Sequence, residues 1–317
     1  MTQGMPDEDL MQQLRRRVGR IHLSQRLGIE EIYERRVFGQ GRTFFHIENW
    51  YSLRGMMRGT LRLGLLLGRS RRNARRIRVR HNTLALSGLP RTFSGYTILQ
   101  ISDLHIDFAP DFSHALIEVI RPLDYDLCVL TGDYRGETFG PYDEALRGLQ
   151  QVRTALQGDV YAVLGNHDTI RMVPGMEAMG IRVLLNEQEA IVNGDGAIYL
   201  AGIDDPHFYR GDNLEKAADT IPEGAVSILL AHSPEIYRHA AHAEFSAMLC
   251  GHTHGGQICL PGGFPLMLNA RCPRKFCHGA WEYNGMAGYT TAGSGACVLD
   301  ARLNCPPEVT LHHLECA

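Results

Sequence analysis

Short, continuous apolar runs recur along the chain from about residue 77 onward, and glycine, aspartate, asparagine or histidine closes each run. Such runs are typical of strands that are buried on both faces of a sheet. Helical patterns at Phe112–Arg121 and Asp143–Leu156 separate the first three runs, so strand and helix alternate at intervals of about 30 residues. This alternation predicts βαβ units, in which right-handed crossovers join parallel strands. The predicted strands are Thr97–Ser102, Leu127–Thr131, Val160–Leu164, Ile198–Ala201, Ser227–Ala231 and Ala247–Cys250.

The ends of five of these predicted strands carry side chains that can bind a metal ion. Ligands of such sheets bind at the carboxyl ends of the strands, where these side chains would meet. Carboxylate, imidazole and amide donors suit manganese, iron, zinc or cobalt, and do not match an all-oxygen calcium site or a thiolate site. Core packing does not explain so many titratable groups, because burying them without partners costs on the order of several kcal/mol. The predicted cluster comprises Asp103, His105, Gly132-Asp133, Gly165-Asn166-His167-Asp168, His232 and Gly251-His252-Thr253-His254.

These motifs, in this order, resemble those of the calcineurin-like metallophosphoesterase superfamily. The segments Gly251–Ile258, Leu260–Gly263 and Asn304–Glu308 further resemble the bacterial YkuE/YaeI-like branch, which includes enzymes that cleave UDP-2,3-diacylglucosamine. The resemblance covers the chain from about Ile77 to its last residue and leaves residues 1–75 outside. It implies an α/β fold, a four-layer αββα sandwich of mixed sheets.

The resemblance also implies a centre with two divalent metal ions, for which manganese is the first choice and zinc, iron and cobalt are alternatives. The third motif would place His167 beside the metals as a general acid or phosphate contact, with Asp168 orienting it. The implied ligands are Asp103, His105 and His254 for the first ion, Asn166, His232 and His252 for the second, and Asp133 as the bridge.

The implied activity is hydrolysis of a phosphodiester or diphosphate bond. Two cations neutralise the anionic phosphoryl group and make hydroxide available near neutral pH, while His167 protonates the leaving oxygen. A lipid-linked substrate such as UDP-2,3-diacylglucosamine is the first hypothesis, and a generic phosphodiesterase for cyclic nucleotides or small diesters is the alternative. A catalytically silent scaffold is disfavoured, because none of the implied ligands is missing.

Two further side chains are candidate substrate contacts. Arg135 could reach the second phosphate of a diphosphate, because its guanidinium matches two phosphate oxygens; a solvated or internally paired arginine is the alternative. His207 could line the cleft, or could lie in a surface loop.

The first 80 residues differ in charge from the rest of the chain. They contain 18 arginines and 7 acidic residues, whereas residues 81–317 contain 14 basic and 28 acidic residues. This contrast predicts a basic, helical extension over residues 1–75, followed by the phosphoesterase domain over residues 76–317. Apolar spacing predicts helices within residues 8–38 and 47–68. The second would carry Arg54, Arg58 and Arg62 on one face, beside a stripe of Trp50, Leu53, Met57 and Leu61.

Three roles are open for this basic segment. It could bind an anionic membrane surface through its arginines, with the apolar stripe entering the bilayer. It could instead pack on its own acidic domain, whereas nucleic-acid binding by the arginine run is disfavoured. The chain has no run near the ~18–20 apolar residues of a membrane span and no apolar signal segment at its start. We therefore expect a cytoplasmic location, peripheral on the inner face of the membrane if the first role holds.

Overall fold

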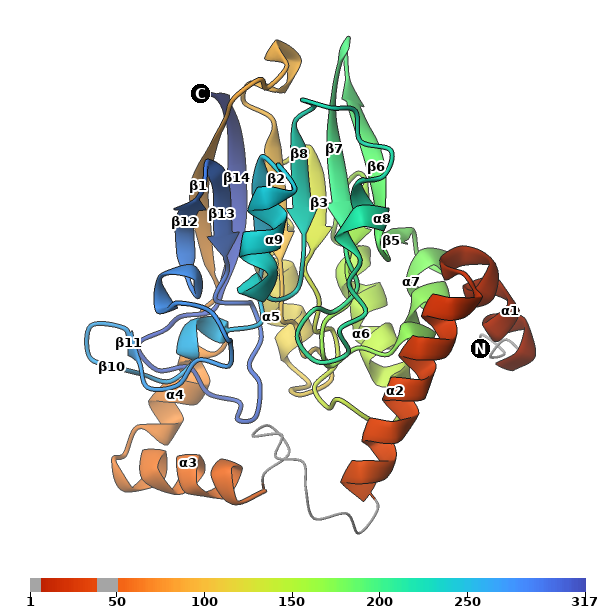
Figure 1. Cartoon of the computed structure of the whole chain (residues 1–317). Helices are drawn as coiled ribbons and strands as arrows, with labels where there is room; N and C mark the ends of the chain where they lie inside the picture. The colour runs from red at the N-terminus through yellow and green to blue at the C-terminus, as the bar shows by residue number, and fades with distance from the viewer. Residues whose placement is uncertain (1–6, 39–50) are drawn as a thin grey trace.

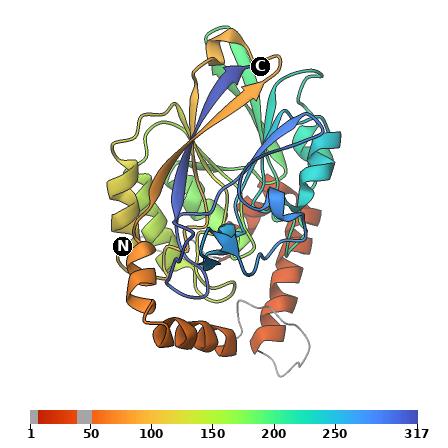
Figure 2. The same ribbon diagram turned by 90° about the vertical axis from the view of Figure 1, so that its left-hand side faces the viewer.

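Two six-stranded sheets lie face to face at the centre of the protein, as a computed structural model of residues 7–38 and 51–317 shows (Figures 1 and 2). Apolar side chains from both sheets, such as Val129 and Leu249, fill the space between them. In spatial order, the first sheet comprises β1 (Arg78–Leu86), β14 (Glu308–Cys316), β2 (Thr97–Ile101), β3 (Leu127–Leu130), β4 (Val160–Ala162) and β5 (Ile181–Val183). The second comprises β12 (Gly279–Tyr283), β13 (Met286–Thr290), β9 (Ala247–Cys250), β8 (Ser227–Leu230), β7 (Gly196–Gly202) and β6 (Glu187–Asn193).

Both sheets are mixed. The strands β2 to β5 run parallel, and so do β13, β9, β8 and β7, whereas β14 pairs antiparallel with β2 and β6 pairs antiparallel with β7. Each strand predicted from the sequence overlaps a strand of the structure, so those predictions are confirmed. The strands that the sequence reasoning missed include β1, β5, β6, β12 and β13. Several of these, such as β1 and β6, expose much of their surface and therefore lack a continuous apolar run.

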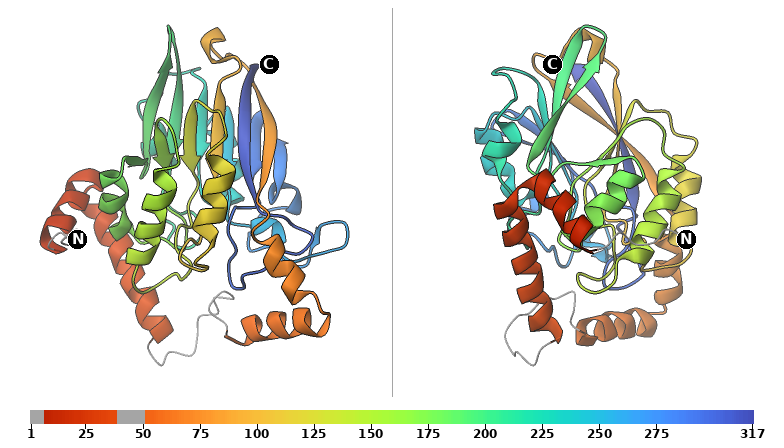
Figure 3. Two further views of the ribbon diagram at one scale, coloured as in Figure 1. Left: turned by 180° about the vertical axis from the view of Figure 1, so that it is seen from behind. Right: turned by 90° about the vertical axis from the view of Figure 1, so that its right-hand side faces the viewer.

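Helices cover the outer faces of both sheets and complete the four layers. The helices α5 (Phe112–Ile120), α6 (Asp143–Arg153) and α7 (Val173–Ala178) pack on the first sheet through a core that includes Leu116 and Leu149 (Figure 3). The helices α8 (Leu214–Ala218) and α9 (Tyr237–His242) cover the second sheet. This arrangement confirms the predicted αββα sandwich.

The helix predicted within residues 8–38 is two helices, α1 (Asp7–Val18) and α2 (Arg20–Phe38). The chain turns between them at Gly19, whose φ of 85° is a conformation that glycine adopts without steric cost. The side chains of Leu14 and Val18 are buried in the core beneath α7. These two helices therefore pack on the four-layer sandwich (Figure 3).

The second predicted helix, 47–68, is also divided. Residues 47–50, including Trp50, lie outside the described part of the chain; α3 (Tyr51–Leu63) and α4 (Leu67–Asn73) follow. The break falls at Leu65, which has a φ of 56°. Leu61 packs against Leu299 and Leu303 of the segment before β14, so part of the apolar stripe is buried in the protein itself. Over the described residues, every helix is too short or too polar to cross a bilayer.

Candidate metal centre

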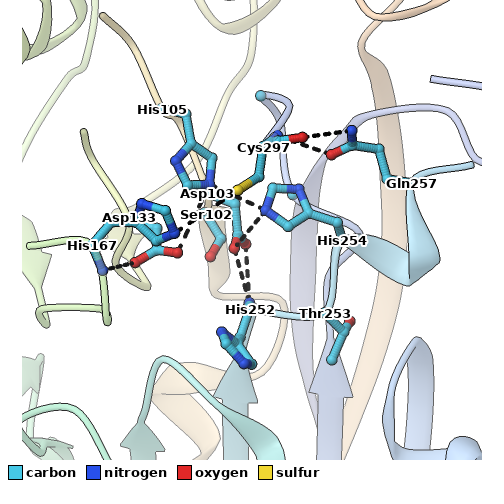
Figure 4. A network of polar contacts seen from close by, with 12 residues as sticks. Ser102, Asp103, His105, Asp133, His167, His252, Thr253, His254, Gln257 and Cys297 are labelled. Atoms are coloured by element: carbon cyan, nitrogen blue, oxygen red, sulfur yellow. Dashed lines mark hydrogen bonds and ion pairs between the residues drawn. The ribbon is translucent and has the colours of Figure 1, made fainter. Parts of the chain in front are cut away.

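The residues at the strand ends adopt an unusual backbone conformation. Asp103 and His105 follow β2, Asp133 follows β3, and His252 and His254 follow β9; all five have φ between 40° and 71°. Non-glycine residues pay on the order of 1–3 kcal/mol for such conformations, which persist only where the surroundings enforce them. Figure 4 shows Asp103, His105, Asp133 and His254 turned toward one another, with His252 beside them.

Glycines allow the strand ends to approach this closely. A Cβ atom on Gly165 would lie 2.2 Å from Asp133 Oδ1, and one on Gly251 would lie 2.0 Å from Ser102 Oγ. Both distances are far below van der Waals contact. These two glycines are therefore required by the close approach of neighbouring loops.

The first group of side chains surrounds His105 and His254. Their Nε2 atoms lie 3.1 Å apart, and His254 Nε2 lies 3.5 Å from Asp103 Oδ1. His105 Nδ1 lies 2.8 Å from the carbonyl oxygen of Arg135, which can only accept, so Nδ1 donates and the Nε2 lone pair faces the centre. On the other side, the Arg302 guanidinium lies 3.1 Å from His254 Nδ1. Arg302 can only donate, so Nδ1 of His254 accepts this contact in the protein without metal.

The second group surrounds His232. His232 Nε2 lies 3.1 Å from Asn166 Oδ1 and 3.2 Å from His252 Nδ1, while His232 Nδ1 lies 2.8 Å from the carbonyl oxygen of Thr131. Asp133 lies between the two groups: its Oδ2 is 3.2 Å from His232 Nε2 and 3.8 Å from His105 Nε2. The structure therefore brings together all seven residues that the resemblance implied as ligands.

Burial and charge at this point fit a cation. Burial raises the pKa of Asp133, but the imidazoles of His232 and His167 lower it more, so that it lies well below its ordinary value. Burial lowers the pKa of His232, but Asp133 outweighs this effect and raises it to about 10. A proton on His232 thus balances the carboxylate in the protein without metal, and a divalent ion would balance it at the same place. The buried nitrogen and oxygen donors suit such an ion.

His167 lies beside these two groups. Its backbone N–H donates to Asp133 Oδ1 at 2.9 Å, and its ring meets the ring of His105 edge-on at a centroid distance of 4.8 Å. The imidazole therefore reaches the centre, as the sequence suggested.

Asp168, which follows His167, accepts hydrogen bonds from the backbone of two loops. Its carboxylate accepts from the backbone N–H groups of Asp133, Tyr134 and Gly165, at 2.8, 2.9 and 2.8 Å. Both oxygens are thus engaged by backbone, and the side chain ties the loop after β3 to the loop after β4. These contacts fix the backbone of the two loops, and the orientation of the His167 ring by Asp168 stays a prediction.

The two candidate substrate contacts also differ. The guanidinium of Arg135 is buried and donates to the carbonyl oxygens of His167, Thr138 and Gly140. These contacts correct the hypothesis of a phosphate contact and leave the internally paired alternative. His207 lies at the centre, with its ring centroid 4.2 Å from that of His252 and its Nδ1 2.9 Å from Glu235 Oε1.

The sequence reasoning missed several residues around the centre. Arg302 is fully buried and donates to the carbonyl oxygens of His254, Ala292 and Gly295, but no motif pointed to it. Cys297 brings its sulfur to 3.8 Å from His167 Nε2. A cavity of about 380 Å³ opens beside these groups. Its apolar lining includes Met56, Met57, Ile258, Leu266, Met267 and Leu268.

Several known proteins are similar to this chain along most of its length. YkoQ of Bacillus subtilis (strain 168), described as an uncharacterized metallophosphoesterase, is 28% identical over 261 residues, which cover 78% of this chain and 94% of that protein. YkuE of the same organism, described in the same way, is 27% identical over 249 residues, covering 75% and 86%. Phosphodiesterase YaeI of Escherichia coli (strain K12) is 28% identical over 236 residues, covering 69% and 82%.

A family model described as calcineurin-like phosphoesterase matches residues 96–256. This segment is half of the chain and contains the strand ends from Asp103 to His254 that meet at the centre. The chain therefore belongs to the calcineurin-like phosphoesterase family and is a metallophosphoesterase, a metal-dependent hydrolase.

Proposed function

We propose that this chain hydrolyses a phosphodiester or diphosphate bond in a lipid-linked substrate such as UDP-2,3-diacylglucosamine. The observation that carries the proposal is the apolar cavity of about 380 Å³, whose lining includes Asp133, His167, His252 and His254. A substrate in this cavity would place an apolar group against methionine and leucine side chains and its phosphate beside the ligand cluster.

The proposed centre holds two divalent ions, with manganese as the first choice and zinc, iron and cobalt as alternatives for the same donors. When bound, the ions would neutralise the charge of the phosphoryl group and lower the pKa of the attacking water. The proposed ligands are Asp103, His105 and His254 for the first ion, Asn166, His232 and His252 for the second, and Asp133 for both.

Besides the metal ligands, His167 is the side chain that we propose takes part in the reaction. We assign its imidazole as the general acid that gives a proton to the leaving oxygen. Its backbone is held on two sides, by the contact of its N–H with Asp133 and by the contact of Arg135 with its carbonyl oxygen. Asp168 fixes the neighbouring loops, and His207 is proposed to contact the substrate beside His252.

The apolar cavity supports the lipid-linked class over small diesters. Each methylene buried in it is worth about 0.8 kcal/mol, so three of them change an affinity by roughly fiftyfold. A cyclic nucleotide gains none of this energy. Hydrolysis of small diesters remains the second candidate, because a relative, YaeI, is named a phosphodiesterase.

The test compares monodisperse UDP-2,3-diacylglucosamine with bis-(p-nitrophenyl) phosphate and a cyclic nucleotide, each with manganese and with zinc. The variant Met267→Asp alters the cavity wall, and Phe264→Asp is its matched control, since Phe264 lies on the same hairpin, is similarly exposed and does not line the cavity. We expect Met267→Asp to lower kcat/KM for the acylated substrate by about tenfold or more, through loss of about two methylene contacts, and to spare the small diester.

A third variant, Asp133→Asn, tests the chemistry and should nearly abolish hydrolysis of every substrate. Equal turnover of acylated and unacylated substrates, or equal effects of the two hairpin variants, contradicts the lipid-linked assignment. Full activity of Asp133→Asn contradicts the two-metal reaction itself.

A further inference from the structure

The sulfur of Cys297 lies at the edge of the proposed metal centre. Cys297 is in the segment that connects β13 to β14, beyond the residues that the family model matches. Its Sγ and one ring nitrogen each of His105 and His254 all lie within 4.8 Å of one another. Figure 4 shows the side chain directed toward these imidazoles from the side opposite Asp133.

Specific contacts fix this segment against the metal-binding turn. The Cys297 backbone N–H donates to Gln257 Oε1 at 2.9 Å, and Gln257 Nε2 donates to the Cys297 carbonyl oxygen at 2.8 Å. Gln257 is buried and follows His254 by three residues. Arg302 adds a second connection, because it donates to the carbonyl oxygens of both Gly295 and His254. These contacts therefore fix the backbone that carries Cys297 relative to the segment that carries His254.

We propose that the Cys297 sulfur is an additional ligand of the first metal ion, together with His105 and His254. This inference rests on the metal centre proposed above and adds a ligand that neither the motifs nor the comparisons assign. Donors bound to one ion at about 2.0–2.3 Å are separated by roughly 3–4 Å, so only a small closing movement is needed. The thiol gives its proton to solvent as the sulfur–metal bond forms.

A thiolate changes which metal the first position prefers. Manganese binds oxygen donors better than sulfur, whereas zinc, cobalt and ferrous iron accept thiolates readily. A sulfur beside two imidazoles and a carboxylate therefore makes the first position selective for zinc, cobalt or iron. The second position has only nitrogen and oxygen donors and therefore accepts manganese as well as zinc, iron and cobalt. The two positions would then hold different ions when several are supplied.

The test uses the full chain, stripped of metal with a chelator and reloaded with cobalt. Bonds between cobalt and thiolate give an intense near-ultraviolet absorption band that sites with only nitrogen and oxygen donors lack. We expect two bound cobalt ions per chain and this band in the wild type. Cys297→Ser should lose the band while the second ion still binds. The matched control Cys316→Ser removes an exposed thiol far along β14 and should keep the band.

Zinc loading gives a second, independent measurement. X-ray absorption at the zinc edge should show a sulfur neighbour at about 2.3 Å in the wild type and in Cys316→Ser, and none in Cys297→Ser. In competition, the preference for zinc over manganese at the first position should fall by about tenfold in Cys297→Ser, which corresponds to about 1.4 kcal/mol.

The outcomes separate this inference from the function it rests on. Two bound cobalt ions without a thiolate band in the wild type overturn the sulfur ligand and leave the two-metal centre unaffected. A band that persists in Cys297→Ser also overturns it, because another cysteine would be its source. Fewer than two bound ions in the wild type contradict the two-metal centre itself.

Discussion

Asp168 is a buried carboxylate that fixes the backbone of two loops at the candidate metal centre. Three backbone N–H groups, from Asp133, Tyr134 and Gly165, converge on its two oxygens. In Asp168→Asn, an amide NH₂ replaces one oxygen and faces a buried N–H group. Leaving such a donor unsatisfied costs about 1–3 kcal/mol. We expect the melting temperature to fall by roughly 5 °C, together with weaker metal binding, as calorimetry and metal titration would measure.

The exposed Asp195 provides the control, since Asp195→Asn changes the same charge on the surface and should leave both quantities unchanged. If Asp168 instead acted on the ring of His167, Asp168→Asn would shift the pH profile of hydrolysis while the melting temperature stayed at its wild-type value. That result would contradict the assigned role.

At the scale of single residues, the sequence indicated which side chains meet but not every contact they make. The strand ends predicted the cluster around Asp133, because parallel strands end at one edge of a sheet. Arg135 and Asp168 occur in the same motifs, yet their partners are backbone groups of neighbouring loops, and residue type does not reveal these. Cys297 was missed because it lies in no strand-end motif and is 130 residues from His167.

At the scale of elements, α2 supports the loop that carries the third motif. Arg26 is fully buried, pairs with Asp204 at 3.1 Å, donates to the Asp168 carbonyl oxygen at 2.9 Å and lies 3.3 Å over the ring of Tyr209. One turn later, Glu30 accepts from Thr169 and from the Ile170 N–H, at 2.6 and 2.9 Å. Of the three roles open for the basic segment, packing on the acidic domain describes this helix.

Arg26→Met should therefore destabilise the protein strongly. It leaves the Asp204 carboxylate buried without its main counter-charge, which costs about 3–5 kcal/mol. Urea unfolding measures this change directly. Arg35→Met, on the exposed part of the same helix, removes only a surface pair with Glu31, worth about 0.3–0.5 kcal/mol. Equal stabilities of the two variants would show that α2 does not depend on the buried pair.

The pair of Arg26 and Asp204 also makes the stability of the folded protein depend on pH. Burial raises the pKa of Asp204, but Arg26 and His22 lower it more, to about 2. Because this folded value lies below the unfolded value of about 3.9, the pair contributes fully above about pH 5 and its contribution is lost as the pH falls toward 2. The loss of stability over this range should be smaller in Arg26→Met than in the wild type. A helix within residues 8–38 was predictable, whereas the partner of Arg26, 178 residues away, was not.

At the scale of the whole molecule, the cavity and a group of exposed apolar side chains lie at the end of the sandwich that carries the candidate metal centre. α3 and the hairpin formed by β10 (Cys259–Leu260) and β11 (Phe264–Pro265) flank this end (Figure 1). Large apolar side chains are exposed there although burial would favour them, and exposed arginines lie beside them on α3 and α4. These side chains are Met56, Leu63, Leu65, Leu260, Phe264, Leu266 and Met267, with Arg58, Arg62, Arg69, Arg71 and Arg72.

This end of the molecule predicts binding to anionic vesicles. Each arginine near an anionic surface contributes about 1 kcal/mol, and the apolar side chains add to it by entering the interface. The full chain should therefore pellet with phosphatidylglycerol vesicles, less so at high salt, and hardly at all with neutral vesicles.

The double variant Leu63→Asp/Leu65→Asp should reduce binding by at least about tenfold, because it replaces two inserting side chains by anions. The control Ile21→Asp/Ile32→Asp alters two exposed apolar residues of α2 and should leave pelleting unchanged. If neutral vesicles bind equally well, the arginines do not contribute to binding. If the Leu63→Asp/Leu65→Asp variant pellets like the wild type, these side chains do not enter the interface, and the lipid-linked assignment then rests on the cavity alone.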